Sequence, residues 1–308
     1  MRRPITGSTQ LYGIFGDPVD HSLSPLMHNA AFADKGMDAV YVAFPVSRKL
    51  LRRAVRAIPA LGLRGINVTV PHKRAIFPLL TRVEPSAALA GAVNTVEVRG
   101  RELVGHNTDG EGLVASLEED LGIRPRGLDI LVLGAGGAAR GVAVALAHHG
   151  ARAIHVANRT VRRATRLVRT LSEAFPSTRF QATGLSAKAL AAVVPLCHVV
   201  INATALGLRE DDPSPLPEEL LHAGLVVVDL IYHRETRLLR EARRQGATTL
   251  GGVGMLLHQG ALAFRIWTGE EAPLEAMRRA LESVLGRASE GVNGKRRKKT
   301  KKGKNLLP

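Results

Sequence analysis

The chain is poor in several residue types and patterns, and each shortage removes a class of protein. One cysteine among 308 residues excludes a disulfide framework and a cysteine-based zinc site, and it fits a reducing compartment. Aromatic residues make up only 4%, too few for the stacking platforms that bind single-stranded nucleic acid. No apolar run approaches the roughly 18 residues of a membrane span, and the first residues lack the apolar segment of a secretory signal. We therefore expect a cytoplasmic protein with no membrane span.

Metal and thiol chemistry are also poorly supported. The 11 histidines are scattered, with no His-Glu-x-x-His spacing, so we expect no metal site. Cys197 opens the apolar run CHVVINAT, which indicates a buried strand thiol rather than a nucleophile.

Basic residues are abundant, and the formal net charge is +16. Residues 294–308 contribute eight lysines or arginines and no acid, which is typical of a solvated, disordered tail. Many of the other arginines have spacings that place them on exposed helix faces. We expect contact with nucleic acid, if any, only through this tail.

A glycine turn follows a short apolar strand in the middle of the chain. The run LDILVL (128–133) leads into the turn, and a small-residue helix over 138–150 and a second strand over 151–158 follow. This order is typical of the dinucleotide-binding βαβ unit, in which the helix N-terminus faces the pyrophosphate. The alternative is a glycine-rich connector in an ordinary parallel sheet. The turn consists of Gly134, Ala135, Gly136, Gly137 and Ala138.

The end of the second strand indicates which dinucleotide binds. An NAD site usually has an acidic residue there, which accepts hydrogen bonds from the ribose hydroxyls. This chain has Asn158-Arg159-Thr160, with Arg162 and Arg163 just beyond. A guanidinium can bind a phosphate in two-point contact, so the sequence predicts NADP.

The remaining strand and helix patterns predict an α/β fold with two domains. We expect an N-terminal α/β substrate-binding and catalytic domain over 1–108 and a Rossmann-type NADP-binding domain over 109–250, with a cleft between them. Two helices over 251–287 should pack back on the first domain, and residues 288–308 form the basic tail.

Candidate catalytic residues lie at the ends of predicted elements in the first domain. The strand GINVTV (65–70) stops at Pro71, and Lys73 would begin a following helix, HKRAIFPLL. Asp109 begins another helix, where its carboxylate is favoured as the anion and could orient a lysine for proton transfer. Each residue also has a structural interpretation: Asp109 as an N-cap, Lys73 as a solvated lysine, and Ser24 before Pro25 as a helix start.

Eight runs occur along the chain in one order: GDPVDHSLSPLMHNAAF (16–32), GINVTVPHK (65–73), GAVNT (91–95), NTDGEG (107–112), LGAGGAARG (133–141), NRT (158–160), DLIY (229–232) and GMLLHQGALAFRIWTG (254–269). This order of motifs resembles the shikimate dehydrogenase family over residues 10–288. The resemblance implies reversible reduction of 3-dehydroshikimate to shikimate by NADPH, in aromatic amino-acid biosynthesis.

The resemblance also implies roles for individual residues. Lys73 is the proton-transfer residue and pairs with Asp109. The implied substrate contacts are Ser22 and Ser24 for the carboxylate, Thr69 and Lys73, Asn94 and Asp109 for ring hydroxyls, and Tyr232 and Gln259. The implied NADP contacts are the glycine turn, Asn158, Arg159, Thr160 and Arg163 for the 2′-phosphate end, and Leu230, Gly252 and Met255 near the nicotinamide.

Other interpretations remain open. A quinate/shikimate dehydrogenase that uses NAD is the nearest enzyme alternative, and Arg159 argues against NAD. A catalytically silent NADP-binding or nucleic-acid-associating protein is the alternative from another class. The loop from Tyr232 to Thr236 is one residue shorter than the family pattern. The oligomeric state could be a monomer or a homodimer.

Overall fold

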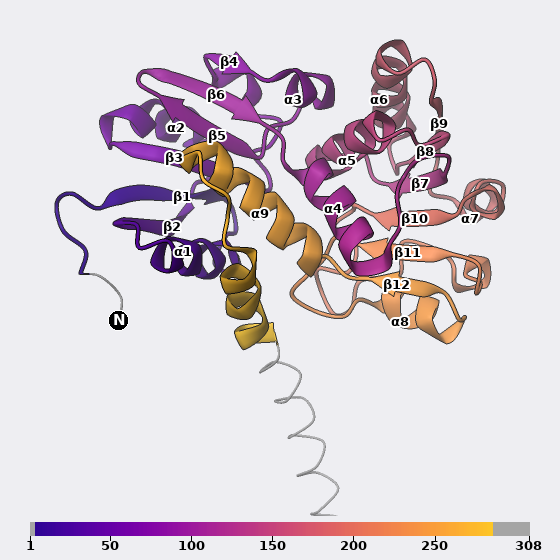
Figure 1. Ribbon diagram of the computed structural model, residues 1–308. Helices are drawn as coiled ribbons and strands as arrows, with labels where there is room; N and C mark the ends of the chain where they lie inside the picture. The colour runs from indigo at the N-terminus through magenta and orange to yellow at the C-terminus, as the bar shows by residue number, and fades with distance from the viewer. Residues whose placement is uncertain (1–3, 286–308) are drawn as a thin grey trace, which may run out of the picture.

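Two β-sheets flanked by helices make up the protein, and they form two lobes side by side (Figure 1). The computed structural model describes residues 4–285, so the predicted basic tail lies outside the described residues. We call the lobe built on the first sheet the first lobe and the lobe built on the second sheet the second lobe. The predicted fold class, mixed α/β with a Rossmann-type part, is confirmed.

The first sheet has six strands in the order β2-β1-β3-β5-β6-β4. β2, β1 and β3 are parallel, whereas β5 runs antiparallel to β3 and forms a hairpin with β6. The hairpin turns at Gly100, whose φ of 63° favours glycine. The strands are β1 (Gln10–Gly16), β2 (Ala39–Pro45), β3 (Leu63–Val68), β4 (Arg82–Val83), β5 (Thr95–Arg99) and β6 (Glu102–His106).

The second sheet is entirely parallel, in the order β12-β11-β10-β7-β8-β9. The chain moves outward from β7 to β9 and then returns to place β10 on the other side of β7. Such a reversal opens a crevice at the carboxyl ends of the two central strands. The strands are β7 (Asp129–Leu133), β8 (Ala153–Ala157), β9 (Arg179–Thr183), β10 (Val199–Asn202), β11 (Val226–Asp229) and β12 (Thr248–Leu250).

Helices cover both sheets, and their sequences explain how closely they pack. α5 is rich in glycine, alanine and valine and is buried along most of its length, so it can lie close to the central strands. The helices are α1 (Ser24–Asp34), α2 (Leu51–Ala60), α3 (Pro85–Ala90), α4 (Asp109–Leu121), α5 (Gly137–His148), α6 (Val161–Ala174), α7 (Ala187–Ala191), α8 (Arg237–Arg244) and α9 (Val253–Thr268), and the 3-10 turns are η1 (Phe77–Leu79), η2 (Val194–Leu196) and η3 (Glu218–Leu220).

Two helices join the lobes. α4 leads from the first sheet to the second, and α9 returns beside it, so that the two helices lie next to each other between the lobes (Figure 1). A Cβ at Gly112 would lie 2.7 Å from the Cβ of Gln259, so glycine is needed for this approach. At the far end of α9, Trp267 Nε1 donates to Val96 O at 3.0 Å. Residues 274–285 form a further helix after α9.

The core of the first lobe depends on these last helices. One apolar cluster joins Tyr12 and Phe32 of the first lobe to Phe264 of α9 and to Met277 and Leu281 of the final helix. All of these side chains are at most 2% exposed. The C-terminal helices therefore complete the core of the lobe that comes first in the chain.

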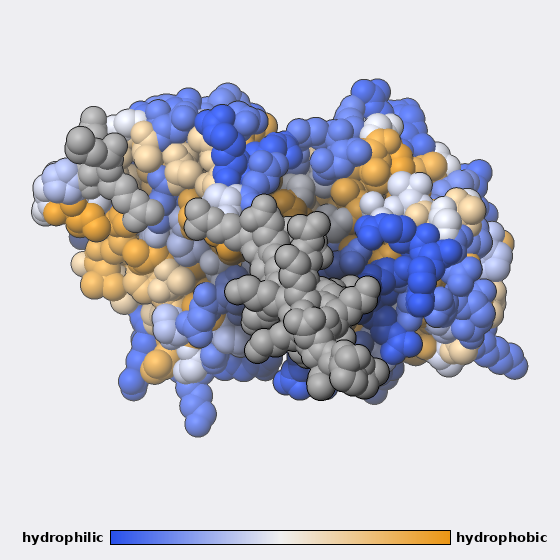
Figure 2. Space-filling model, turned by 90° about the horizontal axis from the view of Figure 1, so that it is seen from below, coloured by the Kyte–Doolittle hydropathy of each residue, from blue (hydrophilic) through white to orange (hydrophobic). Residues whose placement is uncertain are grey.

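The surface of the two lobes differs in character. Seen from below, apolar side chains gather over the first lobe at the left, whereas hydrophilic ones cover much of the second lobe (Figure 2). β2, at the edge of the first sheet, is only partly buried. Within residues 4–285 no helix combines the length and apolar character that crossing a membrane requires.

One predicted helix differs from the structure. The helix expected to begin at Lys73 is wrong: the chain makes turns there, followed only by η1. Pro78 explains this, because it lacks an N–H and disfavours helical geometry in the residue before it. Lys73 therefore lies on a loop.

Candidate active site

Lys73 and Asp109 form a close ion pair between two segments of the first lobe's edge. Lys73 Nζ donates to Asp109 Oδ2 at 2.6 Å, and the two side chains are 15% and 4% exposed. Asp109 is the first residue of α4, and the cap position is Thr108, whose side chain makes no capping bond. The interpretation of Asp109 as an N-cap is therefore wrong, and its carboxylate faces the lysine.

Asn94 joins this pair to the C-terminal helices. Its Nδ2 donates to Asp109 Oδ1 at 3.0 Å and to Gln259 Oε1 at 3.2 Å. Its Oδ1 accepts a hydrogen bond from the Thr108 backbone N–H at 2.7 Å. Four residues predicted from the sequence thus meet in one polar cluster, which we call the lysine cluster: Lys73, Asn94, Asp109 and Gln259.

A second layer of buried polar groups supports the lysine cluster, and the sequence analysis missed it. The Tyr41 hydroxyl donates to Asn67 Oδ1 at 2.8 Å. Asn67 Nδ2 in turn donates to Thr95 Oγ1 at 3.0 Å and to the Asn94 carbonyl at 3.2 Å. The available signal was a polar residue, Asn67, between the apolar Ile66 and Val68 of β3.

The loop before Lys73 is fixed by backbone contacts. His72 Nε2 lies 2.6 Å from the Val46 carbonyl oxygen, and the His72 side chain is fully buried. The Val93 N–H donates to the Lys73 carbonyl at 2.7 Å. Thr69 is half-buried where β3 ends, and its N–H donates to the Phe15 carbonyl at 2.9 Å. These contacts hold Lys73 beside Asn94 without a helix.

Ser22, Ser24 and Tyr232 lie together across the two lobes. Ser24 is buried at the first position of α1, where Leu23 is the cap residue and makes no side-chain bond. The Ser24 N–H donates to Ser22 Oγ at 3.3 Å. Burial raises the pKa of the Tyr232 phenol, and contacts with the Leu23 backbone and the Ser22 side chain oppose that rise. The Ser22 hydroxyl therefore lies near a tyrosine of the second lobe, with the Ser24 backbone N–H beside it.

A buried aspartate positions the segment that carries Leu230 and Tyr232. Asp229 accepts hydrogen bonds from Asn202 Nδ2 at 3.0 Å, from Thr236 Oγ1 at 2.7 Å and from the Ile231 N–H at 3.1 Å. Burial raises the pKa of this carboxyl, and those three bonds oppose the rise. Asp229 thus ties β11 to β10 at the crevice, and its neighbours are fixed with it.

The glycine turn lies directly against Lys73. A Cβ at Gly137, the first residue of α5, would come within 2.8 Å of the Lys73 Cβ. Gly134 has a φ of 111°, and a Cβ there would lie 3.0 Å from the Ala203 carbonyl oxygen, at the chain reversal between β7 and β10. Ala135 is buried and Ala138 half-buried, whereas a Cβ at Gly136 would meet open space. The turn fits close approach of a ligand backbone.

The end of β8 presents free cationic side chains. Asn158 Nδ2 donates to the Thr160 carbonyl at 2.9 Å, and the Arg163 N–H donates to the same carbonyl at 2.9 Å. Arg159, Thr160 and Arg163 are exposed. Within residues 4–285 neither arginine pairs with a carboxylate. Exposed guanidinium groups beside a glycine turn fit a dinucleotide that carries an extra phosphate.

The residues predicted near the nicotinamide differ in their surroundings. The Gly252 N–H donates to the Ile231 carbonyl at 3.2 Å, and a Cβ at Gly252 would collide with the Leu230 carbonyl. Leu230 is half-buried. Met255 is 7% exposed and packs in the apolar core of the second lobe. Leu230 and Gly252 thus lie together, whereas Met255 is chiefly a core residue.

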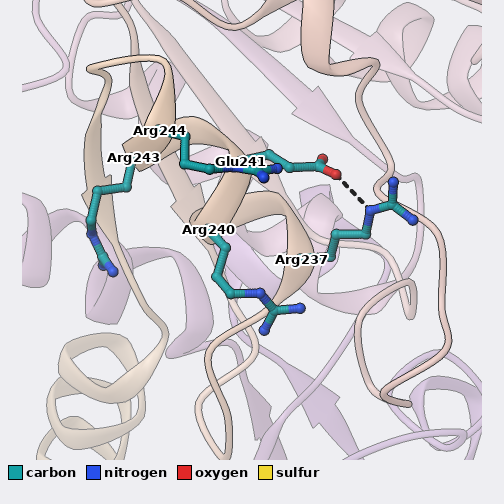
Figure 3. A pocket seen from close by; sticks show the side chains of 5 residues that line it. All are labelled: Arg237, Arg240, Glu241, Arg243 and Arg244. Atoms are coloured by element: carbon teal, nitrogen blue, oxygen red, sulfur yellow. Dashed lines mark hydrogen bonds and ion pairs between the residues drawn. The ribbon is translucent and has the colours of Figure 1, made fainter.

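A separate hollow of about 610 Å³ lies beside α8. Arg237, Arg240, Glu241, Arg243 and Arg244 line it, and none belongs to the lysine cluster (Figure 3). Three of its four arginines already pair with Glu241, Glu235 and Glu218. Residues 4–285 contain no group of three or more histidine, cysteine, aspartate or glutamate side chains that could bind a metal ion.

Three family models match the chain in succession. The shikimate dehydrogenase substrate binding domain matches residues 14–96. The shikimate / quinate 5-dehydrogenase model matches residues 119–208, and the shikimate 5'-dehydrogenase C-terminal domain matches residues 252–282. The matches cover both lobes and α9.

Individual proteins agree with the family models. The NADP(+) shikimate dehydrogenase of Methanopyrus kandleri is 46% identical over 280 residues, covering 90% of this chain and 96% of that protein. The shikimate dehydrogenase of Thermus thermophilus, solved with NADP(H) and shikimate, is 38% identical with a TM-score of 0.79, covering 90% and 100%. The quinate dehydrogenase of Corynebacterium glutamicum, solved with NAD, is 34% identical with a TM-score of 0.80, covering 89% and 99%.

Proposed function

We propose that this chain, which belongs to the shikimate dehydrogenase family, catalyses the reversible reduction of 3-dehydroshikimate to shikimate with NADPH. The observation that carries the proposal is the Lys73–Asp109 pair at 2.6 Å, with the glycine turn in contact with the same lysine. A proton-transfer group thus lies beside a dinucleotide-binding turn. The reaction consumes one ketone, one NADPH and one proton, and it forms one secondary alcohol and one NADP⁺.

Lys73 is the proton donor in this proposal. When bound, NADPH supplies the hydride to the ring carbonyl carbon. The Lys73 ammonium gives a proton to the carbonyl oxygen as negative charge develops there, and in the reverse direction neutral Lys73 accepts the proton. Asp109 keeps the amine oriented through its Oδ2 and is itself fixed by Asn94. The low exposure of the pair keeps water away from the transferred proton.

The substrate contacts follow from the same geometry. We assign the substrate carboxylate to Ser22 and Ser24, with Tyr232 closing over them from the second lobe. Thr69, Asn94, Asp109 and Gln259 lie on the lysine side and suit the ring hydroxyls. Hydroxyl and amide groups at both ends fix the ring so that its carbonyl meets Lys73.

The arginines at the end of β8 support NADP over NAD. Arg159 and Arg163 are exposed and unpaired within residues 4–285, so they can bind the 2′-phosphate without first breaking an ion pair. Asn158 and Thr160 shape that turn. The glycine turn binds the pyrophosphate through backbone N–H groups at the start of α5, and Leu230 and Gly252 border the nicotinamide, with Met255 behind them.

We also propose how the chain is organised. Residues 1–108 act as the substrate-binding domain, 109–250 as the NADP-binding domain, and 251–287 as helices that complete the first. The enzyme works in the cytoplasm as a monomer or homodimer. Any contact with nucleic acid involves the tail over 288–308.

Two rival functions would require different features of the chain. A quinate/shikimate dehydrogenase that uses NAD has support from the quinate dehydrogenase likeness, but a 2′-hydroxyl gives Arg159 no phosphate to bind. A catalytically silent NADP-binding or nucleic-acid-associating protein would have no use for a buried lysine–aspartate pair.

A spectrophotometric assay with four combinations tests the proposal. Reduction of NADP⁺ or NAD⁺ is followed with shikimate or quinate as the only alcohol. We expect the highest kcat/KM for shikimate with NADP⁺. A higher value for quinate with NAD⁺ would support the quinate enzyme, and no turnover with any pair would support the silent protein.

A further inference from the structure

We propose that Asn107 is a positioning residue for this reaction. Its side chain joins the catalytic aspartate to the dinucleotide-binding helix α5. The inference rests on the proposed roles of Lys73 and Asp109. Asn107 itself touches neither of their reactive atoms. It lies in the short connection between β6 and α4, and its side chain is half-buried.

Both ends of the Asn107 amide are used. Its Nδ2 donates to the Ala92 carbonyl at 2.9 Å, two residues before Asn94. Its Oδ1 accepts a hydrogen bond from the Asp109 backbone N–H at 3.1 Å. One planar side chain thus connects the segment that carries Asn94 to the backbone of Asp109. The first N–H groups of a helix lack partners within the helix, so this bond fixes where α4 begins.

The same amide lies against the second lobe. A Cβ at Gly141 would collide with the Asn107 side chain, and its three nearest neighbours would all be Asn107 atoms. Gly141 belongs to α5, four residues after Gly137, whose Cβ would in turn approach Lys73. The helix that presents the glycine turn therefore packs on Asn107 without a side chain between them.

A further contact nearby links the same elements. Arg140 Nη1 donates to the Ala90 carbonyl at 3.0 Å, from α5 to the last residue of α3. The segment from Ala90 to Asn94 is thus bound to the second lobe at its start and to Asn107 at Ala92. Among the residues that make these contacts, Asn107 is the one that also accepts a hydrogen bond from Asp109. Its removal should therefore loosen Asp109 relative to both Asn94 and α5.

The expected effect falls on turnover rather than on cofactor affinity. A small misplacement of a catalytic group can lower the rate about 100-fold. We expect Asn107→Ala to lower kcat about 10- to 100-fold, with KM for NADP⁺ changed less than about threefold, because the phosphate-binding groups are untouched. Asn107→Asp keeps the acceptor for the Asp109 N–H and loses the donor to Ala92.

Thr178→Val is the matched control. It removes a buried hydrogen bond of 2.8 Å to the Ala151 carbonyl in the second lobe, away from the lysine cluster. Both variants should lose stability in chemical denaturation, but only Asn107→Ala should lose turnover. If kcat of Asn107→Ala stays within about twofold of wild type while its stability falls, Asn107 is only structural.

Gly141 gives an independent test of the same contact. Gly141→Ala should push the Asn107 amide away and lower kcat, whereas in Asn107→Ala/Gly141→Ala the new methyl has room. We expect the double variant to be no slower than Asn107→Ala alone, since the two changes act on one contact. Losses that multiply would overturn the proposal. Failure of the proposed function would differ, because wild type would then not oxidise shikimate with NADP⁺ at all.

Discussion

The two lobes prepare for their ligands in opposite ways. In the first lobe, the lysine cluster is already joined by hydrogen bonds from Lys73 to Asp109, from Asn94 to Asp109 and from Asn94 to Gln259. In the second lobe, the ligand-facing parts are a glycine turn with open space at Gly136 and exposed arginines. One lobe presents an assembled polar network, and the other presents backbone groups and exposed arginines.

This difference indicates what each lobe contributes. A network that is already joined by hydrogen bonds loses little by reorganisation when the transition state forms, so the first lobe suits chemistry. Exposed guanidinium groups make charge-assisted bonds only when a phosphate arrives, so the second lobe suits cofactor selection. Substitutions in the first lobe should therefore change mainly kcat, and those in the second mainly KM for the cofactor.

The largest expected effect is on the reaction itself. Lys73→Ala removes the proposed proton donor, and we expect kcat to fall about 10²- to 10⁴-fold. The serines that we propose as carboxylate ligands stay in place, so the substrate dissociation constant should change little. Steady-state kinetics and equilibrium binding of shikimate measure the two quantities. Wild-type turnover in this variant would show that Lys73 is not the proton donor, and it would contradict the assignment of the chemistry to the first lobe.

A smaller effect is expected at the end of β8. Arg159→Ala should raise KM for NADPH about 10- to 100-fold, which corresponds to one lost hydrogen bond between charged groups. KM for NADH should stay nearly unchanged, and so should kcat with saturating NADPH. Arg179→Ala, at the opposite end of the neighbouring strand β9, is a control. An equal loss with NADH would mean that Arg159 does not recognise the 2′-phosphate.

The smallest effect is on the stability of the fold in acid, and it arises from a buried histidine in the core of the first lobe. Burial lowers the pKa of His28, which stacks on Tyr41 in the first lobe, to about 3 from its usual 6.5. Between pH 6.5 and about pH 3, the His28 imidazole binds a proton in the unfolded chain but stays neutral in the folded chain. Stability should therefore fall by about 1.4 kcal/mol per pH unit as the pH drops through this range towards the folded pKa.

Denaturant unfolding at several pH values tests this expectation. His28→Phe keeps an aromatic ring and should reduce the loss of stability on acidification. His222→Gln, at an exposed position of the second lobe, should leave it unchanged. Equal pH dependence in wild type and His28→Phe would show that this imidazole does not limit acid stability.

Much of the architecture could be predicted from local patterns. The βαβ unit around the glycine turn combines apolar strands with a small-residue helix, and the structure has β7, α5 and β8 there. The meeting of Lys73 with Asp109 was predictable only through the family resemblance, because the residues are 36 positions apart. The spacing of residues in a sequence does not by itself predict such a tertiary contact.

Other features were missed because their signals in the sequence were weak. Pro78 was visible, yet the apolar run around it suggested a helix at Lys73, where the chain makes turns. Asn67 and Asn107 looked like ordinary strand and loop residues. Their importance depends on which backbone groups they reach, Asn94 for one and Ala92 and Asp109 for the other. Those partners are set by the fold.

The return of α9 to the first lobe has a consequence for synthesis on the ribosome. Tyr12 and Phe32 are made early, but their partners Phe264, Met277 and Leu281 are made more than 200 residues later. At about 5–20 residues per second, the nascent chain waits on the order of 10 s or more between finishing the first sheet and completing its core. Until α9 and the final helix are made, the first lobe therefore has an open apolar face, and a ribosome that stops before α9 releases a first lobe unable to close.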